Sequence, residues 1–88
     1  MAKVVANYEI EVTYEQWKSV FSANEASRTT AGLKTIYYGH EIDNERKIHI
    51  VLEVPSIEEF KQFMANNAER MKEAGVKRET MVMAFCTD

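Results

Sequence analysis

The order in which the hydrophobic period changes along the chain restricts its fold more than any other feature. Residues 3–12 alternate between apolar and polar side chains, which is typical of a strand with one buried face. Apolar residues then recur at helical spacing as far as Gly32, and again over residues 57–75. Each of these helical stretches is followed by a β-rich run. The pattern therefore predicts strands and helices in alternation.

Three further β-rich runs complete the pattern. Residues 33–42 and 47–54 flank "DNER", four polar residues of the kind that form turns, and so predict a hairpin. The run at 79–86 predicts a last strand, whose inward face carries either Met81, Met83 and Phe85 or Val82 and Ala84.

Helix boundaries are marked by local signals. Thr13 and Gln16 have the spacing of a capping box, and Ser56 and Glu59 repeat it after Pro55. Gly32 and Gly75 are natural stops. The predicted order is β-α-β-β-α-β, an α+β ferredoxin-like fold with a four-stranded antiparallel sheet and two helices on one face. A chain of 88 residues has room for a single domain only, residues 1–88.

In this arrangement one face of the sheet has no cover. A hairpin closed over "DNER" pairs His40 with His49 and Tyr38 with Val51, and places Tyr37 on the face toward the helices. The open face is then too apolar to remain in water, so we expect a homodimer. The predicted interface residues are Ile36, Tyr38, His40, His49, Val51 and Glu53.

Two opposed histidines could supply two ligands to a metal ion. No Cys, Asp or third His falls at ligand spacing beside His40 and His49, so we predict no metal site.

Polar residues occur inside both helical stripes, where core residues are expected. Asn24 and Arg28 lie near the centre of the first stripe, and Asn67 lies within the second. One interpretation is a pocket between helices and sheet for a small ligand, anionic or neutral, since such sites combine apolar walls with a few polar groups. The predicted ligand-binding residues are Trp17, Asn24, Arg28, Tyr37, Phe60 and Asn67. The alternative is that the first helix frays or bends after Phe21 and lets Asn24 and Arg28 reach solvent or a helix end, while Asn67 only forms a hydrogen bond across the helix pair.

Charge and composition exclude several classes of function. The net charge is −3 with both signs interleaved, so no basic stripe is available for nucleic acid. No apolar run approaches the roughly 18 residues of a membrane span. A lone cysteine, Cys86, is typical of a reducing compartment, so we expect a cytoplasmic protein. The sequence shows no catalytic triad spacing and no glycine-rich phosphate loop.

The succession "YEQWKSVF", "R", "AGLKTIYYG", "VP..EEFKQF" and "AGV" resembles a family of short bacterial domains of unknown function within the dimeric α+β barrel superfamily. The resemblance implies two ferredoxin-like subunits that join their sheets into a barrel. Members of that superfamily include cofactor-independent monooxygenases, haem-degrading enzymes, isomerases and stress-induced proteins. The haem-degrading pattern of Asn, Trp and His is incomplete here, because Trp17 lies on the first helix and the second helix has no His. We therefore expect no cofactor.

Three hypotheses for the function follow. The first is a dimeric module that binds a small molecule or is associated with stress. The second is a cofactor-independent monooxygenase- or isomerase-like enzyme acting on a small aromatic or anionic substrate, with Arg28 holding an oxyanion. The third is a purely structural interaction dimer.

Overall fold

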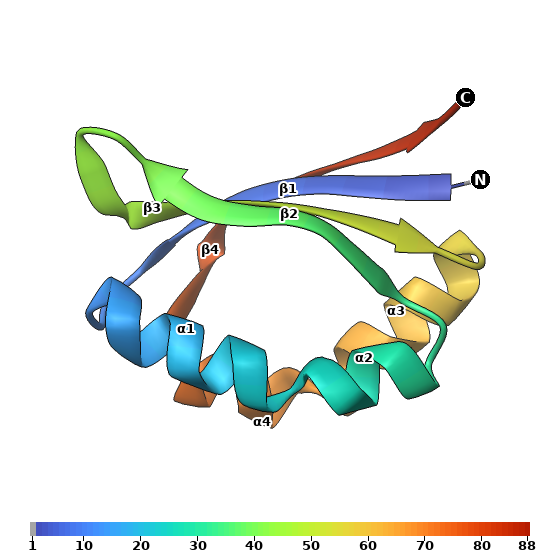
Figure 1. Cartoon of the computed structure of the whole chain (residues 1–88), viewed down its shortest axis with the longest axis horizontal. Coiled ribbons are helices and arrows are strands. Elements are labelled where there is room, and N and C mark those ends of the chain that lie inside the picture. The colour runs from blue at the N-terminus through green and yellow to red at the C-terminus, as the bar shows by residue number, and fades with distance from the viewer. Residues whose placement is uncertain (1) are drawn as a thin grey trace.

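The computed structural model describes residues 2–88, and its strands and helices follow the predicted order with each helix divided in two. The strands form one antiparallel sheet in the order β2-β3-β1-β4, and all the helices lie on one side of it (Figure 1). The ferredoxin-like prediction is confirmed at this level. The elements are β1 (Ala2–Ile10), α1 (Tyr14–Ala23), α2 (Glu25–Thr30), β2 (Lys34–Glu41), β3 (Asn44–Val54), α3 (Ile57–Asn66), α4 (Ala68–Glu73) and β4 (Val76–Thr87).

The core lies between the sheet and the helices. The inward residues of the central strand β1, among them Val4 and Tyr8, are buried, and so are Trp17 of α1 and Phe60 of α3. Strand alternation and helical periodicity thus direct their apolar sides to one interface. Within residues 2–88, no helix is long and apolar enough to cross a membrane.

The predicted helix boundaries are found. Thr13 and Gln16 form a complete capping box, and the Ser56 hydroxyl accepts a hydrogen bond from the Glu59 backbone N–H at 3.1 Å. Gly32 and Gly75 follow the last turns with φ of +83° and +72°. Glycine adopts this left-handed conformation without the strain that a Cβ atom would cause, so both residues end their helices.

The β2–β3 hairpin differs from the predicted register, and the predicted pairing of His40 with His49 is wrong. Glu41 pairs with Asn44, and from there His40 lies opposite Ile48 while His49 lies opposite Gly39. The turn consists of Ile42 and Asp43 alone. In β3, the three residues Glu45 to Lys47 then have no opposite residue in β2. A shift of one residue moves the side chains of Tyr37 to His40 to the other face, and a second irregularity between Thr35 and Tyr37 ends the shift.

Tyr38 and His40 consequently point toward the helices, not the open face. The Tyr38 ring lies 5.8 Å from Trp17, and the His40 ring lies 4.5 Å from Tyr14. Tyr37, predicted on the helix side, is instead 52% exposed on the open face. With the two histidines on opposite faces they cannot share a metal, and residues 2–88 contain no group of three potential ligands.

Strand β4 carries an irregularity that the sequence did not indicate. Glu9 pairs with Lys77 and Asn7 with Val82, so the four residues Arg78 to Met81 lie opposite Tyr8 alone. The Thr80 hydroxyl accepts a hydrogen bond from the Glu9 N–H at 2.8 Å and donates one to the Lys77 carbonyl at 2.6 Å. This side chain therefore closes the bulge, and β4 bends toward α4 (Figure 1).

Candidate functional site

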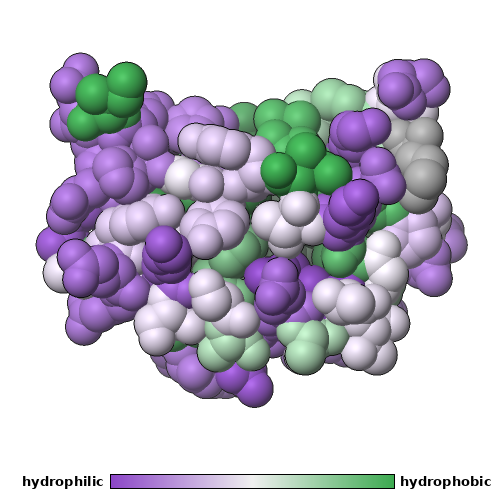
Figure 2. Space-filling view, in the orientation of Figure 1, coloured by the Kyte–Doolittle hydropathy of each residue, from purple (hydrophilic) through white to green (hydrophobic). Residues whose placement is uncertain are grey.

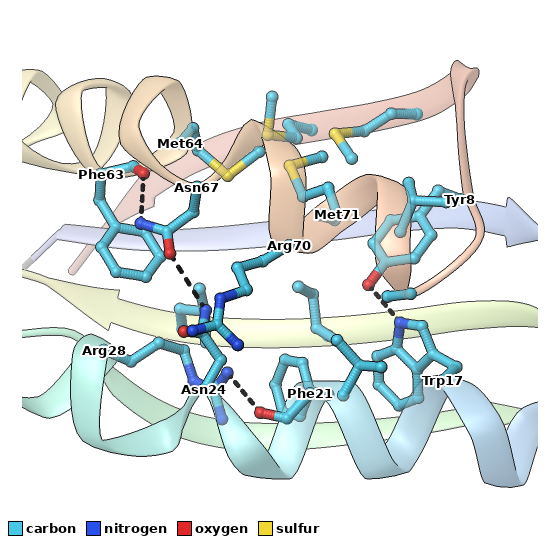
Figure 3. A pocket seen from close by; sticks show the side chains of 18 of the residues that line it. Tyr8, Trp17, Phe21, Asn24, Arg28, Phe63, Met64, Asn67, Arg70 and Met71 are labelled. Atoms are coloured by element: carbon cyan, nitrogen blue, oxygen red, sulfur yellow. Dashed lines mark hydrogen bonds between the residues drawn. The ribbon is translucent and has the colours of Figure 1, made fainter.

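The helices form two layers, α1–α2 and α3–α4, that cover the same face of the sheet. A cavity of about 90 Å³ lies between the sheet and these two helical layers (Figure 3). Its walls combine aromatic rings with methionines, and its amide and guanidinium groups come from the helical side. The walls include Tyr8, Trp17, Phe21, Phe60, Phe63, Met64, Met71, Met81 and Met83, and the polar groups are Asn24, Arg28, Asn67 and Arg70. The cavity therefore has the composition of a small-molecule site, with few polar groups in an apolar enclosure.

Both helical layers are interrupted at an asparagine. Asn24 separates α1 from α2, and Asn67 separates α3 from α4. Neither side chain caps the helix that follows it, so both amides are free to turn inward. The Asn24 Nδ2 donates to the Asn67 Oδ1 at 3.4 Å, and the Asn67 Nδ2 donates to the Phe63 carbonyl at 2.8 Å (Figure 3). The first of these bonds is long and hence weak, so the two amides can exchange it for a ligand.

Arg28 is buried in the cavity wall, with only 5% of its surface exposed. Its Nη1 donates to the Phe21 carbonyl at 2.8 Å, and its Cζ lies 3.7 Å from the centre of the Phe21 ring. The helix is interrupted at Asn24, close to the bend that the alternative interpretation predicts, but Asn24 and Arg28 remain inside and do not reach solvent. The structure therefore combines the helix break of one interpretation with the inward polar residues of the other.

The charge of Arg28 has no anionic neighbour at contact distance. No carboxylate of the described residues lies within 4.0 Å of its guanidinium, and its buried Nε has no hydrogen-bond partner among them. Burial lowers the pKa of the Arg28 guanidinium, although Glu25 and other groups oppose that shift. A buried cation that lacks an anion leaves electrostatic stabilisation available to a ligand.

Tyr8 and Trp17 form a polar pair at the opposite end of the cavity. The Trp17 Nε1 donates to the Tyr8 hydroxyl oxygen at 3.0 Å. Burial raises the pKa of Tyr8 to about 12, although the Trp17 hydrogen bond and Arg28 both act in the other direction. Tyr8 therefore stays neutral throughout the physiological pH range.

The shifted pKa of Tyr8 predicts a loss of stability in alkali. Between pH 10 and about 12 the unfolded chain ionises Tyr8 while the folded chain does not, so the free energy of unfolding falls as the pH rises. This contribution is fully present below pH 10, and its loss amounts to about 1.4 kcal/mol per pH unit at most. Urea unfolding at pH 9 to 11.5 measures it. Tyr8→Phe should show a shallower decline, and equal slopes in both proteins would contradict the assignment.

The structure brings five of the six predicted ligand-binding residues together: Trp17, Asn24, Arg28, Phe60 and Asn67 all line the cavity. Tyr37 does not, because of the hairpin register. Tyr8, Arg70, Met71, Met81 and Met83 line the cavity without having been predicted. Tyr8 could have been found, since it alternates inward with Val4 and Ala6. The placement of Met81 depends on the bulge, for which the sequence gives no signal.

The open face of the sheet is a second candidate surface. Tyr37, Val51, Val5 and Ala84 lie opposite one another across the four strands. Tyr37 and Val5 are 52% and 43% exposed, and Val82 beside them is 60% exposed. In Figure 2, apolar side chains gather near the middle of the upper edge of the molecule, between hydrophilic groups at its two ends. Of the predicted interface residues, Ile36, His49, Val51 and Glu53 remain available to this face.

Comparison with known proteins supports the fold. The family described as "Domain of unknown function (DUF3764)" matches residues 1–87. No curated protein sequence matches the chain.

Two solved structures show the same fold at low sequence identity. A Bordetella bronchiseptica protein, whose name assigns it provisionally to the antibiotic biosynthesis monooxygenases, has a TM-score of 0.79 at 11% identity, over 99% of this chain and 95% of its own. SnoaB of Streptomyces nogalater, a cofactor-independent oxygenase, has a TM-score of 0.72 at 12% identity, over 99% and 91%.

Proposed function

This chain belongs to the DUF3764 family, and from the geometry of its cavity we propose that it binds a small amphipathic carboxylate there. The carboxylate lies against Arg28, Asn24 and Asn67, and the apolar part lies among the surrounding rings. The observation that carries the proposal is the buried Arg28 guanidinium, which lacks an anionic partner among the described residues.

The physical argument rests on what the burial of Arg28 costs. Removing a charge from water is unfavourable, and one carbonyl and one ring compensate only part of that cost. A carboxylate can accept two parallel hydrogen bonds from a guanidinium, which is the strongest pairing available to this side chain. Arg70 contributes a second positive charge to the lining, and Figure 3 shows its side chain reaching toward Asn24.

The cofactor-independent enzyme remains the second candidate because SnoaB, named a cofactor-independent oxygenase, has the same fold. Such chemistry needs a group that accepts a proton from the substrate near neutral pH. Among the described residues, no His, Asp or Glu lines the cavity, and the Tyr8 pKa of about 12 keeps that side chain protonated near neutral pH, so it cannot take a proton from a substrate. Binding is therefore better supported than catalysis. Turnover of a quinol that Arg28→Ala abolishes would favour the enzyme.

The test of binding uses the untagged protein and hexanoate. Native mass spectrometry of protein taken from the expressing cells should show a releasable, acidic molecule, one per chain. After its removal, hexanoate should quench or shift the fluorescence of Trp17, the single tryptophan, which lines the cavity. Hexanol has the same chain without the charge and should bind at least tenfold more weakly. Equal affinity for the two, or no binding of either, would contradict the proposal.

The proposed assembly is a homodimer through the open sheet face, and the proposed compartment is the cytoplasm, because a chain whose one cysteine is Cys86 cannot form an internal disulfide. The row of Tyr37, Val51, Val5 and Ala84 supplies the apolar contact. The purely structural alternative would rest on this face alone, without a ligand in the cavity.

A charge in that row should separate the subunits. Val5→Glu is expected to convert a dimer into a monomer, because the glutamate would be buried without a partner. Light scattering after size-exclusion chromatography measures the mass. Ile42→Glu, at a hairpin residue that is 98% exposed, is the matched control and should remain dimeric. A monomeric wild type, or a dimeric Val5→Glu, would show that this face is not the interface.

A further inference from the structure

A second, larger hollow lies beside the cavity, between the α3–α4 layer and the bent strand β4. This groove has a volume of about 620 Å³. Phe60, Met64, Met71, Met81 and Met83 line both the groove and the inner cavity. These five side chains are therefore the partition between the two spaces.

The inner cavity and the groove differ in volume, and so in the part of a ligand that each can hold. Drug-sized ligands occupy pockets of roughly 300–1,000 Å³, and an engineered apolar cavity of about 150 Å³ in another protein holds one benzene. The inner cavity, at about 90 Å³, is smaller than either and holds a head group with a few carbons. The groove lies within the range for a whole ligand.

The partition is built from side chains that can move aside. Four of its five members are methionines, whose unbranched chains have three rotatable bonds and adapt to irregular shapes. Figure 3 shows the Met64 and Met71 side chains at the cavity wall. Met81 reaches this place because of the bulge that Thr80 closes. The methionine side chains can change rotamer while the helices and the sheet stay in place.

The groove combines an apolar floor with positive charge. Lys61 and Arg78 both line it, and the Lys61 Nζ lies 5.8 Å from the centre of the Phe85 ring. The chain as a whole has a net charge of −3, whereas both charged residues that line the groove are positive. They attract anions to the mouth of the groove.

We infer that cavity and groove form one continuous site for an elongated carboxylate with a flexible alkyl chain, of the fatty acid class. This inference rests on the proposed function, because the carboxylate is held by Arg28. The chain passes between the methionines and lies in the groove against Phe60 and Phe85. Ligand affinity should then depend on chain length beyond what the inner cavity holds.

The test is a calorimetric titration of the wild-type protein with hexanoate, octanoate and decanoate. Each added methylene that becomes buried should strengthen binding roughly twofold to fourfold. Decanoate should therefore bind at least tenfold more tightly than hexanoate. Equal affinity for the three acids, with hexanoate still preferred over hexanol, would overturn this inference and leave the proposed function standing. Failure of all three to bind would overturn both.

A groove-filling variant gives the second arm. Ala65 lines the groove but not the inner cavity, and it is exposed, so Ala65→Trp fills the groove without disturbing the core. This variant should lose at least tenfold in decanoate affinity and keep hexanoate affinity within threefold. Ala26→Trp, at an exposed position on α2 that lines neither space, is the matched control and should retain both affinities. Unchanged decanoate binding by Ala65→Trp would overturn the inference.

Discussion

Arg28→Met is expected to bind hexanoate roughly tenfold to a hundredfold more weakly than wild type, while unfolding at nearly the same urea concentration. A hydrogen bond to a charged group contributes roughly 1.5–3 kcal/mol, which sets the expected loss of affinity. Stability changes little because the variant loses the bond to the Phe21 carbonyl but no longer buries a charge. We expect the free energy of unfolding to stay within about 1 kcal/mol of wild type.

Titration by Trp17 fluorescence and urea unfolding provide the two measurements. Arg46→Met, at an exposed position of the β2–β3 hairpin, is the control for loss of one positive charge and should match wild type in both. Arg28→Lys keeps the charge without the planar fork and should fall between wild type and Arg28→Met in affinity. If Arg28→Met lost more than about 3 kcal/mol of stability, Arg28 would be a structural residue and the proposed site would lose its anchor.

Trp17→Ala should remove a large part of the stability of the domain. Its ring is 1% exposed and contacts the rings of Tyr8, Tyr14, Phe21 and Tyr38. Truncation of a buried tryptophan costs about 3–5 kcal/mol, and the Tyr8 hydroxyl also loses its hydrogen-bond donor. A domain of 88 residues is expected to have only about 4–13 kcal/mol in total.

Urea unfolding followed by circular dichroism measures this loss. Trp17→Phe keeps most of the ring contacts and should retain the greater part of the stability, which separates packing from the hydrogen bond. A loss below about 1 kcal/mol in Trp17→Ala would mean that the aromatic cluster does not hold α1 on the sheet.

The sequence determined the features whose causes are local. Alternation and helical periodicity assigned every strand and both helical layers, and cap residues such as Thr13 and Gly75 placed their ends. The same periodicity identified Asn24, Arg28 and Asn67 as polar residues inside apolar stripes, and the structure buries Arg28 and Asn24 at the cavity. Periodicity is a property of neighbouring residues, so no tertiary information was needed.

The tertiary structure alone decided how these parts meet. A shift of one residue in the hairpin register decides whether Tyr37 or Tyr38 faces the helices. The observed register is stabilised by the packing of Tyr38 on Trp17 and Phe21, two residues outside the hairpin. The interaction of Asn24 with Asn67 joins residues 43 positions apart. The bulge that turns Met81 toward the cavity depends on the hydrogen bond between the Thr80 hydroxyl and the Glu9 N–H of β1. Each of these outcomes results from contacts between distant segments, and such contacts leave no period in the sequence.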